Sequence, residues 1–198
     1  MKAKEIRLIY QGEHLCLYEI LFSDENGNQK TYEMVSRIGS KHNGQEPLSL
    51  DRLGKTLNAI VLFVLNKNRT KALLPIEFRM SVNQYVIGNI AGLVEPGETA
   101  EEAARRELFE ETGLELLHVD KAFPASFICS GMTDEAGSFL ICTADGEIRP
   151  SDSIYEEIHA KWITKSEARE ILRSTHAACS SRMQLMLWMW AEGLLDKM

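Results

Sequence analysis

Four of the six glutamates between positions 98 and 111 could supply a metal site: Glu98, Glu107, Glu110 and Glu111. Three of them, Glu107, Glu110 and Glu111, are spaced i, i+3 and i+4, so on a helix their side chains share one face. Carboxylates this close repel one another, and the C-terminal half of a helix disfavours negative charge. A hard cation such as Mg²⁺ makes the arrangement favourable, because it binds carboxylates and substrate phosphate together. The spacing therefore indicates metal-assisted phosphate chemistry, although a solvated acidic helix could carry the same three residues.

A helix from Ala100 to Thr112 is expected to position these carboxylates. Thr99 is a good N-cap residue, and Glu102 three residues later completes a capping box. The residues between are mostly strong helix formers and include no glycine or proline. Gly113 stands where helices commonly end in a left-handed residue. The pattern predicts a helix of about three and a half turns.

The wider stretch 92–114 matches a known enzymatic signature at every fixed position. The signature is G-x5-E-x7-R-E-U-x-E-E-x-G-U, with U an aliphatic residue. The positions are filled here by Gly92, Glu98, Arg106, Glu107, Leu108, Glu110, Glu111, Gly113 and Leu114. This stretch resembles the Nudix hydrolases, which cleave diphosphate bonds. So complete a match favours the catalytic interpretation over a solvated acidic helix.

The resemblance implies how the motif works. In Nudix enzymes the Arg-Glu and Glu-Glu pairs supply metal ligands, so Glu107 and Glu111 are the first candidates for metal binding and catalysis, with Glu110 next. Glu98 is expected to join or orient the same cluster. Arg106 is expected to hold a neighbouring carboxylate in place. The implied metal is Mg²⁺, with Mn²⁺ as a substitute.

Other positions of the motif have structural roles by the same resemblance. Gly92 is expected to let the loop fold tightly, and the carbonyl oxygen of Ala91 just before it would be a further metal ligand. Gly113 ends the helix. Glu101 and Glu102 occupy variable positions of the signature, so we interpret them as solvated or capping residues.

The flanks of the motif resemble the ADP-ribose pyrophosphatase branch of the family. That branch has an N-terminal β unit, similar to residues 27–37 here, and a closing pair of helices. It also has a Gln/Glu-aromatic-Arg stretch, matched by Glu77-Phe78-Arg79. Arg79 could form charge-assisted bonds to phosphate or could be a surface residue. Residues 88–92 lack the usual Glu and Pro, and Ser130 replaces a common proline, so the sugar pocket could differ from that of the branch.

The implied reaction is hydrolysis of a nucleoside diphosphate linked to another moiety, with ADP-ribose giving AMP and ribose 5-phosphate. A general base must take the proton of the attacking water. In this branch the base often comes from an acidic loop after the motif, which residues 145–157 match. Glu156 is our first candidate and Glu157 the second. Each of these acids could instead be an ordinary solvated loop residue.

Two alternatives remain open at this point. Another Nudix activity, on a different sugar nucleotide, a dinucleotide or a nucleoside triphosphate, would use the same motif. A non-catalytic nucleotide sensor with a Nudix fold belongs to a different class. Such sensors tend to have lost motif carboxylates and often carry a basic DNA-binding appendage. Here every motif carboxylate is present.

Composition bounds the class of protein. The 198 residues carry a net charge of −7, which argues against nonspecific nucleic-acid binding. Hydrophobic residues make up 44% of the chain, and no apolar run reaches the roughly 18 residues of a membrane span. The four cysteines are scattered, and the first residues lack the apolar core of a secretory signal. We expect a cytoplasmic protein whose partner is a small nucleotide.

The order of elements predicts an α/β fold, a Nudix-type α/β/α sandwich with a mixed sheet. Residues 1–45 are expected to form a small antiparallel β unit involved in dimerisation, and residues 55–198 the Nudix domain. Two helices, 164–173 and 180–195, are expected to close the chain. The last is apolar nearly all round, which predicts burial on more than one side, in the core and in a homodimer interface.

Overall fold

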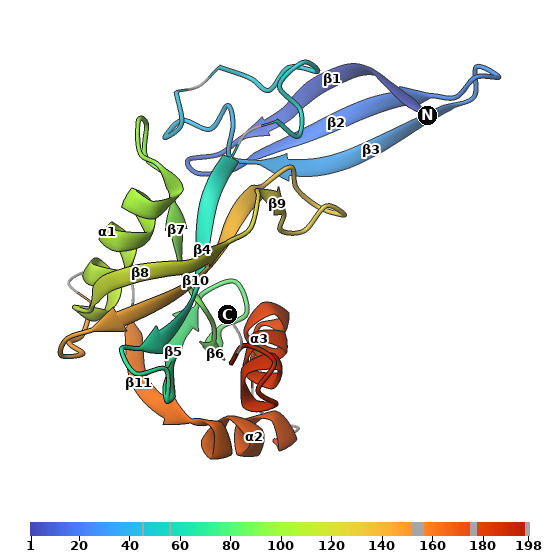
Figure 1. Cartoon of the computed structure of the whole chain (residues 1–198). Helices are drawn as coiled ribbons and strands as arrows, with labels where there is room; N and C mark the ends of the chain where they lie inside the picture. Colours follow the sequence, from blue (N-terminus) through green and yellow to red (C-terminus); the bar gives the residue numbers. More distant parts are fainter. Residues whose placement is uncertain (45, 56, 152–156, 175–177, 197–198) are drawn as a thin grey trace. The chain divides into compact units, whose positions relative to one another are not determined.

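The computed structural model describes residues 1–44, 46–55, 57–151, 157–174 and 178–196. The chain divides into two compact units. Unit 1 contains Met1–Asn58 and Ala125–Gly137, and unit 2 contains Ala59–Pro124 and Ser138–Met198. Figure 1 gives the labels of the elements used below.

Unit 1 is built on a three-stranded antiparallel sheet in the order β1-β2-β3. Its strands are β1 (Lys2–Gln11), β2 (Cys16–Ser23) and β3 (Gln29–Ser36). A turn joins the last two strands, where the Asp24 carboxylate accepts hydrogen bonds from the backbone N–H groups of Asn26 and Asn28 at 2.9 and 2.8 Å. The predicted antiparallel β unit is therefore confirmed, and β1 adds a strand that the sequence had not indicated.

The core of unit 1 lies on one face of this sheet. Alternate residues of β2 point to it, as the period of a strand requires. The buried members are Cys16, Tyr18, Ile20, Met34, Ile38 and Leu48. The Tyr18 hydroxyl donates to the Ile38 carbonyl and accepts from the Leu48 N–H, each at 2.9 Å. These two bonds fix the chain that follows β3 against the sheet.

The larger sheet has the order β11-β5-β4-β10-β8, with β6 paired to β5, β7 to β4 and β9 to β10. Its strands are β4 (Leu57–Asn66), β5 (Lys71–Arg79), β6 (Gln84–Ile87), β7 (Ile90–Leu93), β8 (Glu115–Ala122), β9 (Ser126–Phe127), β10 (Ala136–Asp145) and β11 (Ile158–Thr164). Strands β8 and β9 follow each other closely in the chain but are separate. Pro124 lies in the gap, where it has no N–H to donate to a ladder.

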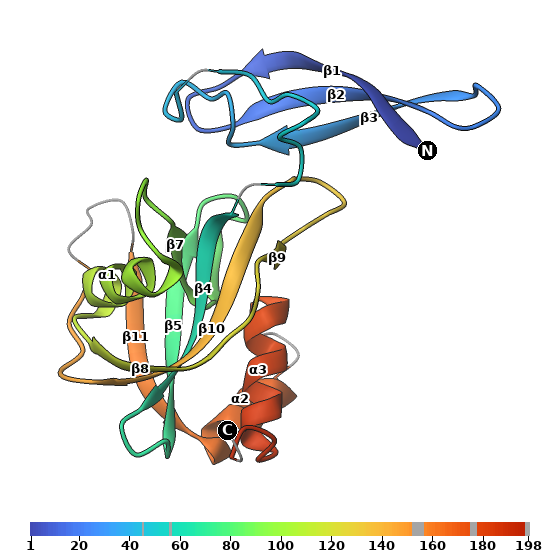
Figure 2. The ribbon, with the colours of Figure 1, turned by 45° about the horizontal axis from the view of Figure 1, so that its top comes forward.

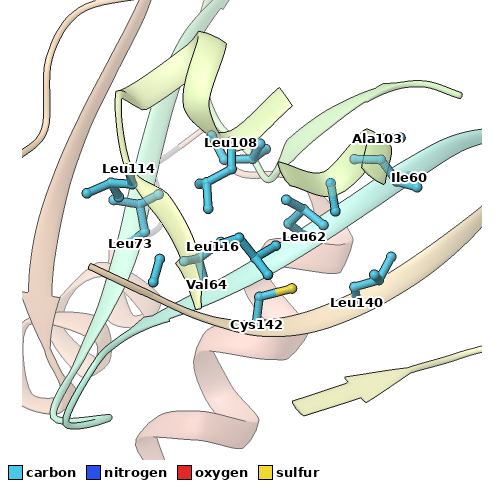
Figure 3. Close-up of a cluster of buried hydrophobic side chains, with 13 residues drawn as sticks. Ile60, Leu62, Val64, Leu73, Ala103, Leu108, Leu114, Leu116, Leu140 and Cys142 are labelled. Atoms are coloured by element: carbon cyan, nitrogen blue, oxygen red, sulfur yellow. The ribbon is translucent and has the colours of Figure 1, made fainter. Parts of the chain in front are cut away.

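Three helices cover the two faces of this sheet in unit 2 (Figure 2): α1 (Ala100–Thr112), α2 (Lys165–Arg173) and α3 (Ser181–Ala191). On one face, Ile60, Leu62 and Val64 of β4 share a buried cluster with Leu108 of α1 (Figure 3). On the other, the alternate β4 residues pack with α2 and α3. The predicted α/β/α sandwich is thereby confirmed.

Helix α3 begins after Ser180, whose hydroxyl accepts from the Met183 N–H at 3.2 Å. It ends at Ala191, earlier than the predicted residue 195, because Gly193 adopts a left-handed φ of 76°. Its core face is buried, whereas Leu185 and Trp188 are exposed. Within the described part of the chain, no helix is long and apolar enough to span a membrane.

Candidate active site

Helix α1 has the boundaries that the sequence predicts, Ala100–Thr112. The Thr99 hydroxyl accepts from the Glu102 N–H at 3.2 Å, and the Glu102 carboxylate accepts from the Thr99 N–H at 2.8 Å. At the other end Gly113 adopts a left-handed φ of 74° and donates to the Phe109 carbonyl. Both ends of the helix are therefore fixed by contacts within a few residues. These contacts determine the direction in which its acidic face points.

Arg106 lies at the centre of the motif carboxylates. Its Nε and Nη2 donate to the two oxygens of Glu98 at 2.8 and 3.0 Å, a bidentate pair. Its Nη1 donates to Glu107 at 2.8 Å and lies 3.4 Å from Glu110. A further bond from Nη2 to the Leu93 carbonyl, at 3.0 Å, ties the helix to the end of β7. One guanidinium thus gathers three of the four predicted acids.

This network keeps Glu98 charged. The hydrogen bonds from Arg106 lower the pKa of Glu98 to about 2, with a smaller contribution from the Glu95 N–H. Reciprocally, the bond to Glu98 is the main cause that raises the pKa of the Arg106 guanidinium. At neutral pH Glu98 is therefore in the ionised form that a metal ion requires of a carboxylate.

The carboxylates of α1 differ in exposure. Glu111 is only 7% exposed, whereas the Glu110 side chain is 57% exposed and meets Arg106 at the longest of the three distances. Buried carboxylates are held in place by their surroundings, while exposed ones keep their rotamer freedom. Glu107 and Glu111 are therefore more tightly held than Glu110, and their roles as metal ligands stay a prediction.

Gly92 lies in strand β7, opposite Ile60 of β4, and not in a turn. Its φ is not positive, so the backbone does not require glycine for its conformation. The requirement is one of space, because a Cβ at this position would overlap the carboxyl group of Glu107. The residue before it, Ala91, lies in the same short strand. The glycine of the signature thus makes room for the carboxylate of the helix.

The oxygen donors fit a hard divalent cation. Among the residues that the structure describes, no three His, Cys, Asp or Glu side chains are arranged to hold a metal on their own. Arg106 accounts for this, because it binds the carboxylates of Glu98 and Glu107 directly. Mg²⁺ is usually held by one or two carboxylates together with water and substrate phosphate. The chemistry of the donors therefore suits a metal that binds together with its substrate.

Arg79, predicted to bind phosphate, lies at the end of β5 and pairs with Glu77 at 2.8 Å. Its position in the ladder is opposite Gln84 of β6. The guanidinium is partly exposed, so a second anion could reach it. A role in substrate binding remains a prediction.

Of the two predicted bases, Glu156 lies outside the described residues and Glu157 lies directly before β11. The Glu157 carboxylate accepts a hydrogen bond from the Tyr85 hydroxyl and lies 3.5 Å from Nε2 of His159. Its backbone carbonyl accepts from the Phe78 N–H at 3.2 Å. The Tyr85 bond is the main cause that lowers the pKa of Glu157. The sequence did not indicate Tyr85 or His159 as partners of Glu157, since these residues meet only through the pairing of β6 and β11 with β5.

Comparison with known proteins places this arrangement in a family. The model of the NUDIX domain matches residues 54–183, well over half of the chain. A solved structure described as an ADP compounds hydrolase has the same fold, with a TM-score of 0.69 at 14% identity over 99% of this chain and 94% of that one.

Curated relatives are closer in sequence than that structure, and those named below are longer than this chain. The ADP-sugar pyrophosphatase of Mus musculus is 28% identical over 71% of this chain and 60% of its own length. The putative nudix hydrolase 2 of Caenorhabditis elegans is 24% identical over 71% of this chain and 59% of its own. The NAD-capped RNA hydrolase NUDT12 of Homo sapiens is 28% identical over 57% and 23%. The signature, the fold and the family model agree, and the chain belongs to the Nudix family of hydrolases.

Proposed function

We propose that the protein hydrolyses the diphosphate bond of a nucleoside diphosphate linked to another moiety, in a reaction that depends on Mg²⁺ or Mn²⁺. The first substrate to test is ADP-ribose, which would give AMP and ribose 5-phosphate. The single observation that carries the proposal is the cluster of motif carboxylates, Glu98 and Glu107, that Arg106 binds. A helix with a purely structural role would not require such a cluster of carboxylates.

Each motif residue would have a distinct role in the reaction. Glu107 and Glu111 would be the main metal ligands, with Glu110, Glu98 and the carbonyl oxygen of Ala91 available to complete the set. A bound divalent ion would neutralise diphosphate oxygens and lower the pKa of an attacking water. Arg106 would hold Glu98 and Glu107 in place, and its pairing shows how closely these carboxylates can approach a single cation. Arg79 would bind a phosphate oxygen in place of its present partner, Glu77.

The proton of the water would be taken by Glu156. Its neighbour Glu157 already accepts a hydrogen bond from Tyr85 and lies beside His159, so its carboxylate has a positioning role. In this assignment Glu157 fixes the end of the acidic loop to the sheet, and the preceding residue does the chemistry. General bases of this kind contribute roughly 10²- to 10⁴-fold to a rate.

Two relatives support a substrate with a diphosphate bridge. The names of the mouse and human proteins refer to an ADP-sugar and to an NAD-capped RNA, and both contain an adenosine diphosphate joined to a second moiety. The carboxylate cluster would act on that bridge in either case. At residues 88–92 and at Ser130 the sequence differs from the ADP-ribose pyrophosphatase branch. These differences would change how the second moiety is bound, so other sugar nucleotides and dinucleotides remain alternatives.

A substrate panel tests the proposal. We expect metal-dependent release of AMP from ADP-ribose, and slower turnover of GDP-mannose and 8-oxo-dGTP, each followed by chromatography with and without Mg²⁺. Turnover of the triphosphate alone would overturn the assigned substrate class. Binding of ADP-ribose with no turnover of any compound would instead indicate a nucleotide sensor, the alternative from a different class.

We also propose a cytoplasmic homodimer in which unit 1 of one subunit helps to close the pocket of the other. The exposed Leu185 and Trp188 on α3 support an apolar contact surface. Light scattering at micromolar concentration should give the mass of a dimer. A monomer under those conditions would refute the assembly and leave the proposed reaction untouched.

A further inference from the structure

Two histidines of unit 1, His14 and His42, lie in contact on the surface of that unit. Their ring centres are 5.3 Å apart, and the planes of the rings are tilted by 56°. Both residues are exposed to solvent. One belongs to the turn between β1 and β2 and the other to the segment that follows β3. The fold of unit 1 therefore brings together two imidazoles that lie far apart in the chain and outside the acidic motif.

Backbone hydrogen bonds hold the two segments together beside the rings. The Lys41 N–H donates to the Gly12 carbonyl at 3.2 Å, and the His42 N–H donates to the Glu13 carbonyl at 3.0 Å. The turn is closed by the Gly12 N–H, which donates to the Leu15 carbonyl at 2.8 Å. Because the backbones are joined at these positions, the imidazoles are already close before a ligand arrives. Ligand groups arranged in advance lose less conformational entropy on binding.

The separation of the rings fits a shared metal ion. Two imidazoles on one tetrahedral zinc ion, with Zn–N bonds of about 2.0–2.1 Å, place their ring centres roughly 5 Å apart. The observed separation of 5.3 Å agrees with that arrangement. The tilt of 56° excludes face-to-face stacking, in which the in-plane lone pairs of the two rings run parallel and cannot converge on one ion.

The ligand type selects the metal. Imidazole nitrogen suits Zn²⁺, Cu²⁺ and Ni²⁺, whereas hard cations such as Mg²⁺ prefer oxygen. The carboxylate of Glu13 lies 3.6 Å from the Lys41 ammonium group, so these two neighbouring charges offset each other. No three His, Cys, Asp or Glu side chains form a metal group among the described residues, so water must complete the coordination. We propose that His14 and His42 form a binding site for a divalent transition-metal ion, with Zn²⁺ the best fit to the ring separation.

This site belongs to unit 1 and does not depend on hydrolysis at the motif. The test titrates the full chain with Zn²⁺ in excess Mg²⁺ and follows the histidine side chains by NMR. The signals of His14 and His42 should move together, with one common affinity. The signal of His118, an exposed histidine of β8, should stay in place. Because each signal reports its own ring, Zn²⁺ bound by the motif carboxylates is not mistaken for this site.

Two variants locate the site. His14→Gln and His42→Gln each remove one imidazole from an exposed position and keep a polar side chain. The affinity of the remaining histidine for Zn²⁺ should fall about tenfold or more, because a second ligand on the same chain no longer holds the ion. His118→Gln is the matched control, and its affinity should equal that of the unmodified chain. Zn²⁺ should also raise the melting temperature of the control more than that of either variant.

Several outcomes would overturn the proposal. They are the absence of movement at millimolar Zn²⁺, independent movement of the two signals, equal movement of His118, and an unchanged affinity in both variants. Thermal melting without metal checks that each variant is folded. Turnover of ADP-ribose, measured with Mg²⁺ alone, should be the same in both variants as in the unmodified chain. The failure of either proposal is therefore visible without reference to the other.

Discussion

Unit 2 contains two groups of acidic residues that are held in place in different ways. The motif carboxylates converge on Arg106, and its bond to Glu98 joins residues only 8 positions apart. The carboxylate of Glu157 is held by Tyr85, which is 72 positions away in the chain. The first group is shaped by one helix and the turn before it, and the second by the register of a sheet.

This difference explains what each group can do. A cluster built on one capped helix moves as a unit, so its oxygens keep a common arrangement with respect to a ligand. A carboxylate positioned by two neighbouring strands depends on contacts that form only after those strands have paired. We therefore assign the chemistry to the first group and positioning to Glu157, and the following experiments test this assignment.

The largest effect should follow from Glu111→Gln. The change removes a charged donor and keeps the shape of a side chain that is almost fully buried. A metal ion at such a site contributes several kcal/mol, so kcat should fall about 1,000-fold or more. Release of AMP from ADP-ribose measures it.

The control lies on the same helix. Glu101→Gln also removes one negative charge, but Glu101 pairs with Arg105 on an exposed part of the helix. Its activity should stay within about twofold of the unmodified chain, since surface pairs of this kind contribute little. Equal activity of Glu111→Gln and the unmodified protein would exclude the mechanism.

A smaller loss should separate two neighbouring residues after β10. Glu156→Gln should lower kcat about 100-fold because it removes the proposed general base, whereas Glu157→Gln should lower it less than tenfold. Stopped assays over a range of pH measure both. If Glu157→Gln has the larger effect, the base is the residue held by Tyr85 and the two roles must be exchanged.

The same contrast accounts for what the sequence could predict. The ends of α1 were predicted to the residue, because Thr99 and Gly113 act on their immediate neighbours. Strand β1 was missed, since its register shifts, between Ala3 and Glu5 and between Leu8 and Tyr10, interrupt the alternation that marks a strand. Interactions between near neighbours can be predicted from a sequence, whereas the strand with which another strand pairs cannot.

For the site, the identities of the motif acids could be predicted but not their common partner. The resemblance assigned Arg106 to one neighbouring carboxylate, and the structure gives it three. The reason for Gly92 also differs from expectation. Its lack of a side chain serves the approach of Glu107 and not a tight turn. The distance between a strand and a helix that pack together is a tertiary property that spacing alone cannot give.

Gly92→Ala tests that approach. The added methyl group should push the Glu107 carboxylate from its position and lower kcat on the order of tenfold, as changes around metal ligands commonly do. Gly88→Ala is the matched control, because a Cβ there meets no other atom within 4 Å. Thermal melting should show both variants folded. Equal activity of the two would mean that the position of Glu107 has no influence on the reaction.

Arg106→Gln should change the pKa of Glu98 as well as the activity. Without its donors, the pKa of Glu98 should rise from about 2 toward its usual value of 4.5. Because the pKa of the folded state is the lower one, the stabilisation from this pair is complete above pH 4.5 and is lost as the pH falls through about 2. NMR titration of the Glu98 carboxyl carbon measures the pKa, and an unchanged value would show that other groups hold it down.

The smallest effect should follow from Tyr85→Phe, which removes the main donor to Glu157 and keeps the ring that packs edge-on against Phe78. The pKa of Glu157 should rise toward its ordinary value, because the bond that lowers it is gone and only the weaker contribution of His159 remains. Turnover should change less than threefold if Glu157 only positions the loop, since a phenol–carboxylate bond near the surface contributes little to a rate. The same carboxyl titration by NMR, in parallel with AMP release, measures both quantities. A large loss of turnover together with a small change in the pKa of Glu157 would indicate that Tyr85 takes part in the reaction. Glu157 would then belong to the catalytic site together with the motif carboxylates.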